Sequence, residues 1–152
     1  IHSASHKYNQ IYTSEQAFFD DLEQMNSIIK AQTGNDASII RFPGGSSNTV
    51  SKDYCPGIMT QLVNDVTARG LLYCDWNVSS GDANNKPIST EQVVQNVISG
   101  VQSHNVSVVL QHDIKDFSVN AVEQIIQWGQ ANGYTFLPLT TSSPMSHHRV
   151  NN

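Results

Sequence analysis

Strand-like and helix-like patterns alternate along the whole chain, and this limits the possible folds more than any other feature. Helices are predicted over residues 13–32, 56–70, 89–101 and 118–132, because apolar residues recur there every three or four positions. Short β-rich runs predict strands over residues 38–42, 71–74, 106–110 and 134–137. Strands that alternate with helices favour right-handed crossovers and a parallel sheet. The sequence therefore predicts an α/β fold.

The number of predicted strands bounds the architecture. The chain has 152 residues, enough for one compact domain. Closing a barrel takes about eight strands, and only four are predicted. The chain begins with Ile1 and shows no signal-peptide pattern. We therefore expect residues 1–152 to form a single domain, an incomplete (β/α) barrel whose N-terminal strands are missing from this chain.

Composition excludes two classes of partner. The formal net charge is −5, from 8 basic and 13 acidic residues, whereas nucleic-acid binding needs clustered Lys and Arg. No apolar run approaches the roughly 20 residues that span a bilayer, so we expect no membrane span in this chain. The two cysteines, Cys55 and Cys74, are compatible with one disulfide or with two free thiols.

Polar residues follow three of the predicted strands. Arg41 stands at the end of the first, Asp75 follows the second and His112 the third, at spacings of 34 and 37 residues. Because the carboxyl ends of parallel strands meet at one edge of a sheet, we expect the three side chains to converge on one rim.

A pair of histidines stands at the beginning of the sequence. His2 and His6 are four residues apart, which places both imidazoles on one side of a helical turn and suits a divalent transition metal. The alternative is two exposed histidines near a terminus. A carboxylate ligand would complete such a site, but Asp20 and Asp21 are not expected to supply it. The apolar residues beside these two acids mark the buried face of their helix, so the acids fall on its solvated side.

Four short motifs stand at these positions, one after another. They are His2-Ser3-Ala4-Ser5-His6, Arg41-Phe42-Pro43-Gly44-Gly45, Asp75-Trp76 and Leu110-Gln111-His112. In order, they resemble the His-(Ser/Thr)-x-x-His, Arg-x-Pro-(Tyr/Gly)-Gly, Asp-x-x-Asp-Trp and Leu-x-His motifs of the polysaccharide deacetylases, the NodB-like domains of carbohydrate esterase family four. Leu72 takes the first acidic position of the third motif, and the family's Thr-Phe-Asp-Asp-Gly motif is absent. The resemblance implies the C-terminal three quarters or so of a NodB-like catalytic domain.

The resemblance implies a metal site and its surroundings. His2 and His6 would bind a divalent metal together with a carboxylate of the absent motif, with Zn²⁺ expected and Co²⁺, Ni²⁺ or Mn²⁺ as alternatives. Arg41 would pair with the absent catalytic base and keep it ionised. The backbone N–H near Gly44 would bind the oxyanion of the tetrahedral intermediate.

The resemblance also implies a general acid. His112 would protonate the departing nitrogen, and Asp75 would orient the His112 ring and favour its charged form. Trp76 and Leu110 would line an apolar slot for the acetyl methyl group.

Each of these residues also has a structural interpretation. Asp75 and Arg41 could form a structural ion pair, Trp76 could belong to the core, Gly44 could only make a turn, and His112 could be a surface histidine. For the remaining histidines, which are His104, His147 and His148, the structural interpretation is preferred, although the segment 143–148 also resembles the family.

The function implied by the resemblance is a metal-dependent hydrolase that removes acetyl groups from a polysaccharide. Its substrate would be the N-acetylglucosamine of peptidoglycan or of a chitin-like glycan, or acetylxylan, and its place the cell surface or the medium outside the cell. Its partners would be that acetylated polysaccharide and the missing N-terminal segment of the same domain. The rival hypothesis is an inactive or carbohydrate-binding relative or fragment that lacks the catalytic base.

Overall fold

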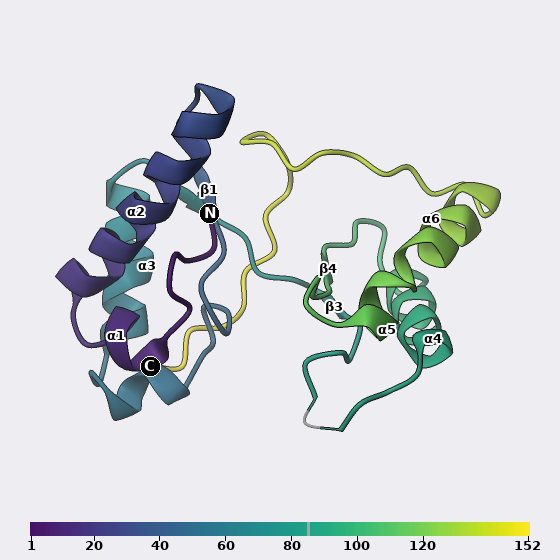
Figure 1. Cartoon of the computed structure of the whole chain (residues 1–152), viewed down its shortest axis with the longest axis horizontal. Helices are drawn as coiled ribbons and strands as arrows, with labels where there is room; N and C mark the ends of the chain where they lie inside the picture. Colours follow the sequence, from purple (N-terminus) through teal and green to yellow (C-terminus); the bar gives the residue numbers. More distant parts are fainter. Residues whose placement is uncertain (85) are drawn as a thin grey trace. The chain divides into compact units, whose positions relative to one another are not determined.

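The computed structural model describes residues 1–84 and 86–152 (Figure 1). The described chain divides into two compact units. The first unit holds Ile1–Asp75 and Thr140–Asn152, and the second unit holds Trp76–Leu139. We describe each unit by itself.

The first unit contains three α-helices, a short 3-10 helix and one two-stranded sheet among its described residues. In chain order they are α1 (Tyr8–Ile11), α2 (Glu15–Thr33), β1 (Ile39–Ile40), η1 (Val50–Asp53), α3 (Ile58–Ala68) and β2 (Leu72–Tyr73). Strands β1 and β2 pair in parallel, with Ile39 opposite Leu72 and Ile40 opposite Tyr73. This parallel pair joined by a helix is the unit that the alternating pattern predicted.

The ends of α2 show why this helix has its length. The Ser14 hydroxyl accepts a hydrogen bond from the backbone N–H of Ala17 and so caps the first turn, one residue later than the predicted start at Thr13. At the other end Gly34 adopts φ 78°, and its N–H donates to the carbonyl of Lys30. A left-handed residue at this position ends the helix, close to the predicted end at residue 32.

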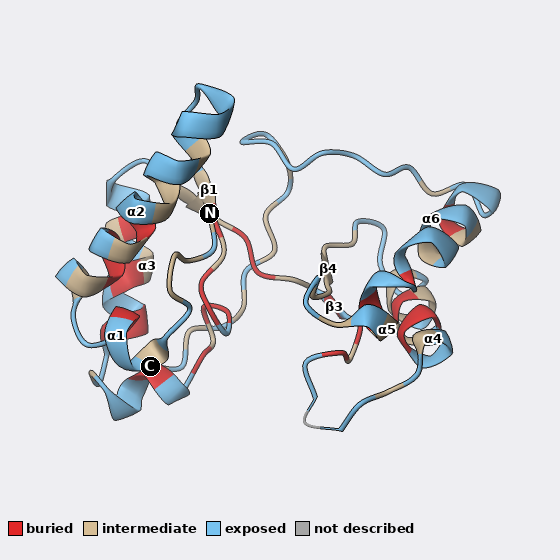
Figure 2. Cartoon of the chain, viewed as in Figure 1, coloured by how far each residue is buried: buried red, intermediate tan, exposed pale blue. Residues whose placement is uncertain are grey.

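The core of the first unit is formed by buried side chains of α1, α2, α3 and β1 and of the loop that follows β1 (Figure 2). Its buried side chains are Ile11, Tyr12, Phe18, Phe19, Leu22, Ile40, Phe42, Ile58, Met59, Leu62 and Val66. Each fully buried aliphatic or aromatic side chain of this kind stabilises the fold by about 1.5–3 kcal/mol. The core therefore fixes the loop after β1, which carries the Arg41–Gly45 motif.

The second unit holds the remaining elements. They are β3 (Val78–Ser79), α4 (Thr90–Val101), β4 (Val109–Leu110), α5 (Asp116–Val119) and α6 (Val122–Ala131). Strands β3 and β4 pair in parallel, with Val78 opposite Val109. A small core of Val93, Val94 and Ala121 joins α4 to the segment between α5 and α6.

The second unit departs from the predictions in three ways. The predicted helix 118–132 is two helices, and the strand β3 was not predicted. The predicted strand 134–137 is not a strand in the structure, and Phe136 and Leu137 are 52% and 80% exposed. A β-rich run needs a neighbouring strand to satisfy its backbone groups, and among the described residues these have none.

The two cysteines are both free thiols, and Cys74 is buried. Across the two ranges that the structure describes, no helix combines the length and apolar character that crossing a membrane requires.

Candidate active site

The turn at the start of the first unit brings His2 and His6 together. Their ring centroids lie 5.0 Å apart, with the ring planes inclined at 51°. The residues between them form a bend and no helical turn, and His6 itself has φ 54°. The predicted convergence of the two rings is thus present, but the predicted helical geometry is wrong.

The environment of His2 suits a neutral metal ligand. Its Nδ1 lies 2.7 Å from the carbonyl oxygen of Arg41, which leaves Nε2 as the nitrogen with a free lone pair when Nδ1 carries the proton. Desolvation of the ring lowers the pKa of His2, and this favours the neutral form that coordinates metals. Among residues 1–84 and 86–152, no group of three potential metal-ligating side chains is present. The two imidazoles therefore fit part of a metal site.

Arg41 lies directly after β1 and reaches the two residues that follow β2. Its Nε donates to the carbonyl of Cys74 (3.1 Å) and its Nη2 to the carbonyl of Asp75 (3.2 Å). Both acceptors are main-chain oxygens, so the guanidinium makes no ion pair with the Asp75 carboxylate in this structure.

Gly44 lies in an exposed turn whose geometry favours glycine. The N–H of Gly45 donates to the carbonyl of Phe42 (2.8 Å), and Gly44 has φ 78°. A Cβ on Gly44 would collide with the hydroxyl of Tyr8. Among the described residues the Gly44 N–H donates to no backbone or side-chain acceptor, so it remains a candidate oxyanion donor.

Asp75 is fully buried at the end of β2. Its carboxylate accepts hydrogen bonds from the N–H and the hydroxyl of Ser46 (2.8 and 2.5 Å) and from the N–H of His148 (2.9 Å). Its own N–H donates to the carbonyl of Ser146 (2.7 Å). Asp75 therefore ties the loop after β1 to the C-terminal segment.

The C-terminal segment makes a second contact beside this one. The His147 ring stacks on Tyr73 at 4.0 Å, and its Nε2 lies 3.0 Å from the Tyr73 carbonyl oxygen. The segment 143–148, which resembles the family, is thus fixed against β2.

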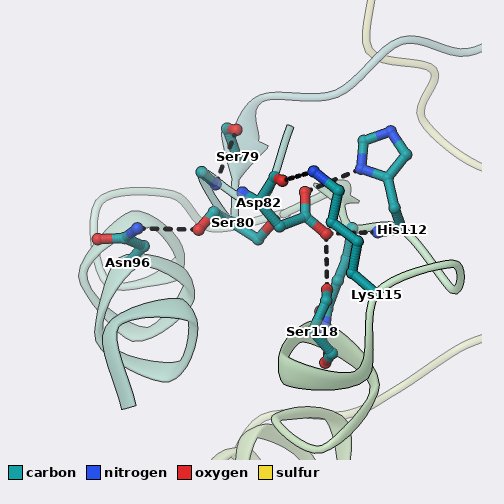
Figure 3. A network of polar contacts seen from close by, with 9 residues as sticks. Ser79, Ser80, Asp82, Asn96, His112, Lys115 and Ser118 are labelled. Carbon is teal, nitrogen blue, oxygen red and sulfur yellow. Dashed lines mark hydrogen bonds and ion pairs between the residues drawn. The ribbon is translucent and has the colours of Figure 1, made fainter. Parts of the chain in front are cut away.

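A network in the second unit centres on Asp82, which is only 2% exposed (Figure 3). Its Oδ1 lies 2.8 Å from Nδ1 of His112, and its Oδ2 accepts from the His112 N–H (2.7 Å) and the Ser118 hydroxyl (2.6 Å). The Lys115 ammonium donates to the Asp82 carbonyl. Asp82 follows β3, and His112 follows β4, so the parallel pairing of these strands brings the two together.

The Asp82 carboxylate is ionised at neutral pH. Burial by itself would raise its pKa, but the hydrogen bonds from Ser118 and His112 outweigh this and lower the pKa to about 2. A buried carboxylate on Nδ1 holds the His112 ring in one orientation and favours the tautomer with hydrogen on Nδ1. Nε2 is then the nitrogen that can exchange a proton with a substrate.

This geometry corrects one predicted role. The carboxylate that contacts the His112 ring belongs to Asp82, where we expected Asp75. Like the other candidates, Asp82 comes shortly after a strand, and the apolar Val78 of β3 is the sequence signal for it. Because β3 has only two residues, its pattern is too short to be recognised in the sequence.

Trp76 and Leu110 both lie in the second unit with His112. Leu110 ends β4 opposite Ser79, and its carbonyl accepts from the N–H of Ser80 (3.0 Å). Both side chains are half-buried. Their predicted role at an acetyl group stays a prediction, as do the roles of Arg41 and Gly44.

The comparisons with known proteins agree on one family, although no family model matches the chain. The crystal structure of the catalytic domain of a peptidoglycan N-acetylglucosamine deacetylase from Eubacterium rectale is 99% identical, with a TM-score of 0.99 over 100% of this chain and 69% of that chain. The chain belongs to carbohydrate esterase family four, the polysaccharide deacetylases. Its structure accordingly has the NodB-type fold of these catalytic domains.

Two further proteins are similar to this chain at lower sequence identity. A peptidoglycan-N-acetylglucosamine deacetylase of Bacillus cereus is 28% identical over 140 residues, which cover 90% of this chain. The chain spans about half the length of that curated relative, 48%. A pseudoenzyme of the same family from Bacillus anthracis shares the fold at 21% identity, with a TM-score of 0.64 over 88% of this chain and 41% of that chain.

Proposed function

We propose that this family member is a metal-dependent hydrolase that removes acetyl groups from a polysaccharide. The substrate is the N-acetylglucosamine of peptidoglycan or of a chitin-like glycan, with acetylxylan as the alternative. The observation that carries this proposal is the contact between Asp82 and His112, because a buried carboxylate that orients an imidazole allows that imidazole to act as a general acid. The names of the relatives from E. rectale and B. cereus support the same substrate class.

His112 supplies the proton that amide cleavage needs. An amine anion is a poor leaving group, so the nitrogen must be protonated as its bond to the acetyl carbon breaks. Nδ1 of His112 faces Asp82, and Nε2 is the atom that gives up the proton. The ionised Asp82 stabilises the charged imidazolium that must exist before this transfer.

His2 and His6 are the residues of this chain that would hold the metal, with Zn²⁺ expected and Co²⁺, Ni²⁺ or Mn²⁺ as alternatives. The bound ion would polarise the acetyl carbonyl and make it a better electrophile. The E. rectale catalytic domain is longer than this chain, and we expect a carboxylate ligand and the catalytic base to come from outside the sequence described above.

Other residues of this chain would hold the substrate and the base. Arg41 has guanidinium N–H groups beyond the two that bind main-chain carbonyls, and these would pair with the base carboxylate. The Gly44 N–H would donate to the oxyanion, and Trp76 and Leu110 would contact the acetyl methyl group. In the complete domain the strands would form the (β/α) barrel of which this chain, residues 1–152, would be the C-terminal part.

We place the protein at the cell surface or outside the cell, because the proposed polymers lie there. The second candidate function is an inactive or carbohydrate-binding relative. The B. anthracis pseudoenzyme favours keeping it, because the same fold there accompanies a chain that is called a pseudoenzyme.

The test is acetate release from acetylated chito-oligosaccharide by a form of the protein extended to the full length of the E. rectale domain. We expect release that depends on added Zn²⁺ or Co²⁺ and stops with a chelator. His112→Ala should reduce the rate by about 100- to 10,000-fold, the range that general acids contribute. His104→Ala is the matched control, since the His104 ring contacts the Gly100 carbonyl of α4, the helix that ends just before it. Absence of release with every metal would favour the second candidate, whereas equal loss in both variants would contradict the role of His112 as general acid.

A further inference from the structure

The helix α2 sends one carboxylate to the turn that carries the histidine pair. Asp21 Oδ2 accepts hydrogen bonds from the Ser3 hydroxyl (2.6 Å) and the Ala4 N–H (2.9 Å), and Oδ1 accepts from the Ser5 N–H (2.9 Å). All three donors lie between His2 and His6 in the sequence. A single side chain thus binds every residue that separates the two imidazoles.

The Ser3 hydroxyl extends this connection to His6. Its oxygen accepts the N–H of His6 (2.8 Å) while its hydrogen is donated to Asp21. His6 has φ 54°, a left-handed conformation that residues with a side chain adopt at a cost in free energy. Charge-assisted hydrogen bonds are stronger than neutral ones, so the Asp21 carboxylate can hold the turn in this conformation.

The neighbouring acid offers a natural comparison. Asp20 is exposed and accepts a hydrogen bond from Gln16 Nε2 (2.6 Å) on its own helix. It has the same charge and the same helix position within one residue, yet no hydrogen bond joins it to the turn 2–6. Substitutions of Asp20 and Asp21 can therefore be compared to separate the effect of a negative charge on α2 from the effect of the hydrogen bonds to the turn 2–6.

We propose that Asp21 is a positioning residue: its carboxylate fixes the turn 2–6 so that His2 and His6 direct their rings at one divalent ion. The inference rests on the proposed function, because that function assigns the ion to these histidines. Asp21 does not coordinate the ion itself; it acts through residues 3–5, which lie between the two histidines. Residues that orient metal ligands commonly change metal affinity by about 10- to 100-fold when they are replaced.

The test measures Co²⁺ binding by calorimetry and visible absorption in the full chain. Asp21→Ala should weaken the affinity about 10- to 100-fold, and Asp21→Asn should lie between it and the wild type, because an amide keeps only one acceptor oxygen. Asp20→Asn should bind Co²⁺ as the wild type does. Hydrogen exchange of the Ala4 and Ser5 amides should speed up in both Asp21 variants and stay unchanged in Asp20→Asn. If Asp21→Ala does not fold, Asp21→Asn and Ser3→Ala carry the test.

Two results would overturn the inference, and they differ from each other. Unchanged Co²⁺ affinity in Asp21→Ala, against loss of binding in the double variant His2→Ala with His6→Ala, would remove the role of Asp21 and leave the metal site intact. Unchanged binding in the double variant would remove the metal site itself, and the role of Asp21 with it.

Discussion

Asp75 and Asp82 are two buried aspartates that follow strands, yet their carboxylates contact different kinds of groups. Asp75 receives its hydrogen bonds from the main chain and from a hydroxyl, and so joins two stretches of backbone. Asp82 also binds a main-chain N–H and a hydroxyl, but its remaining oxygen contacts the imidazole of His112. Position after a strand therefore marks a candidate residue, and only the donors around it decide whether it acts on the fold or on a reactive group.

The largest expected difference between the two aspartates is in catalysis. Asp82→Asn keeps the volume but removes the charge that stabilises the imidazolium, so acetate release by the extended protein should fall about 100-fold. The measurement is the rate at saturating substrate, together with a melting curve to show that the variant is folded. A rate within threefold of wild type, at roughly the experimental scatter of such assays, would separate Asp82 from the reaction.

The next difference is in stability. Asp75→Ala removes the acceptor of the Ser46 N–H, of the half-buried His148 N–H and of the shorter of the two hydrogen bonds of the Ser46 hydroxyl, which should lower the free energy of unfolding by about 3 kcal/mol. Urea unfolding measures this, and faster exchange of the His148 amide would locate it. An unfolding free energy close to that of the wild type would contradict the anchoring role.

The smallest expected effect concerns Ser118, which donates to Asp82. Ser118→Ala should lower the free energy of unfolding by about 1 kcal/mol. It should also raise the pKa of Asp82, because it removes a hydrogen bond that favours the charged carboxylate. In the folded wild type this pKa is about 2, below the ordinary aspartate value of 3.8, so Asp82 stabilises the fold above about pH 4 and that contribution is lost as the pH falls toward 2. A titration of the Asp82 carboxyl carbon by NMR from pH 1.5 to about 6 measures this pKa in the wild type and in Ser118→Ala. An Asp82 pKa that does not move in Ser118→Ala would show that this bond leaves the carboxylate unaffected.

Much of the local structure could be predicted from the sequence. The helices α2 and α4 form within one to two residues of their predicted ranges, and Ser89, the first residue of the predicted range 89–101, caps α4. The strands β1, β2 and β4 lie within the predicted runs but keep only two residues each. The predicted strand over residues 134–137 was wrong because β propensity is a local property, whereas a strand also needs a neighbouring strand that the sequence does not specify.

The candidate site was predictable only where sequence spacing sets the geometry. The proximity of His2 and His6 follows from a short turn, and the place of His112 follows from a strand end. The contacts of Asp21 and Asp82 join residues 16 and 30 positions apart, and such distances are set by packing. Asp21 in particular lies on a helix face that the pattern marked as solvated, and it is the turn 2–6 that covers it.

We propose that Asp82, and not Asp75, holds His112 for proton transfer. Long-range proton–nitrogen NMR correlations of the His112 ring in the wild type, Asp82→Ala and Asp75→Ala test it most directly. We expect hydrogen on Nδ1 in the wild type and in Asp75→Ala, and a shift of the hydrogen to Nε2 in Asp82→Ala. A ring that keeps its tautomer in Asp82→Ala and changes it in Asp75→Ala would contradict the account.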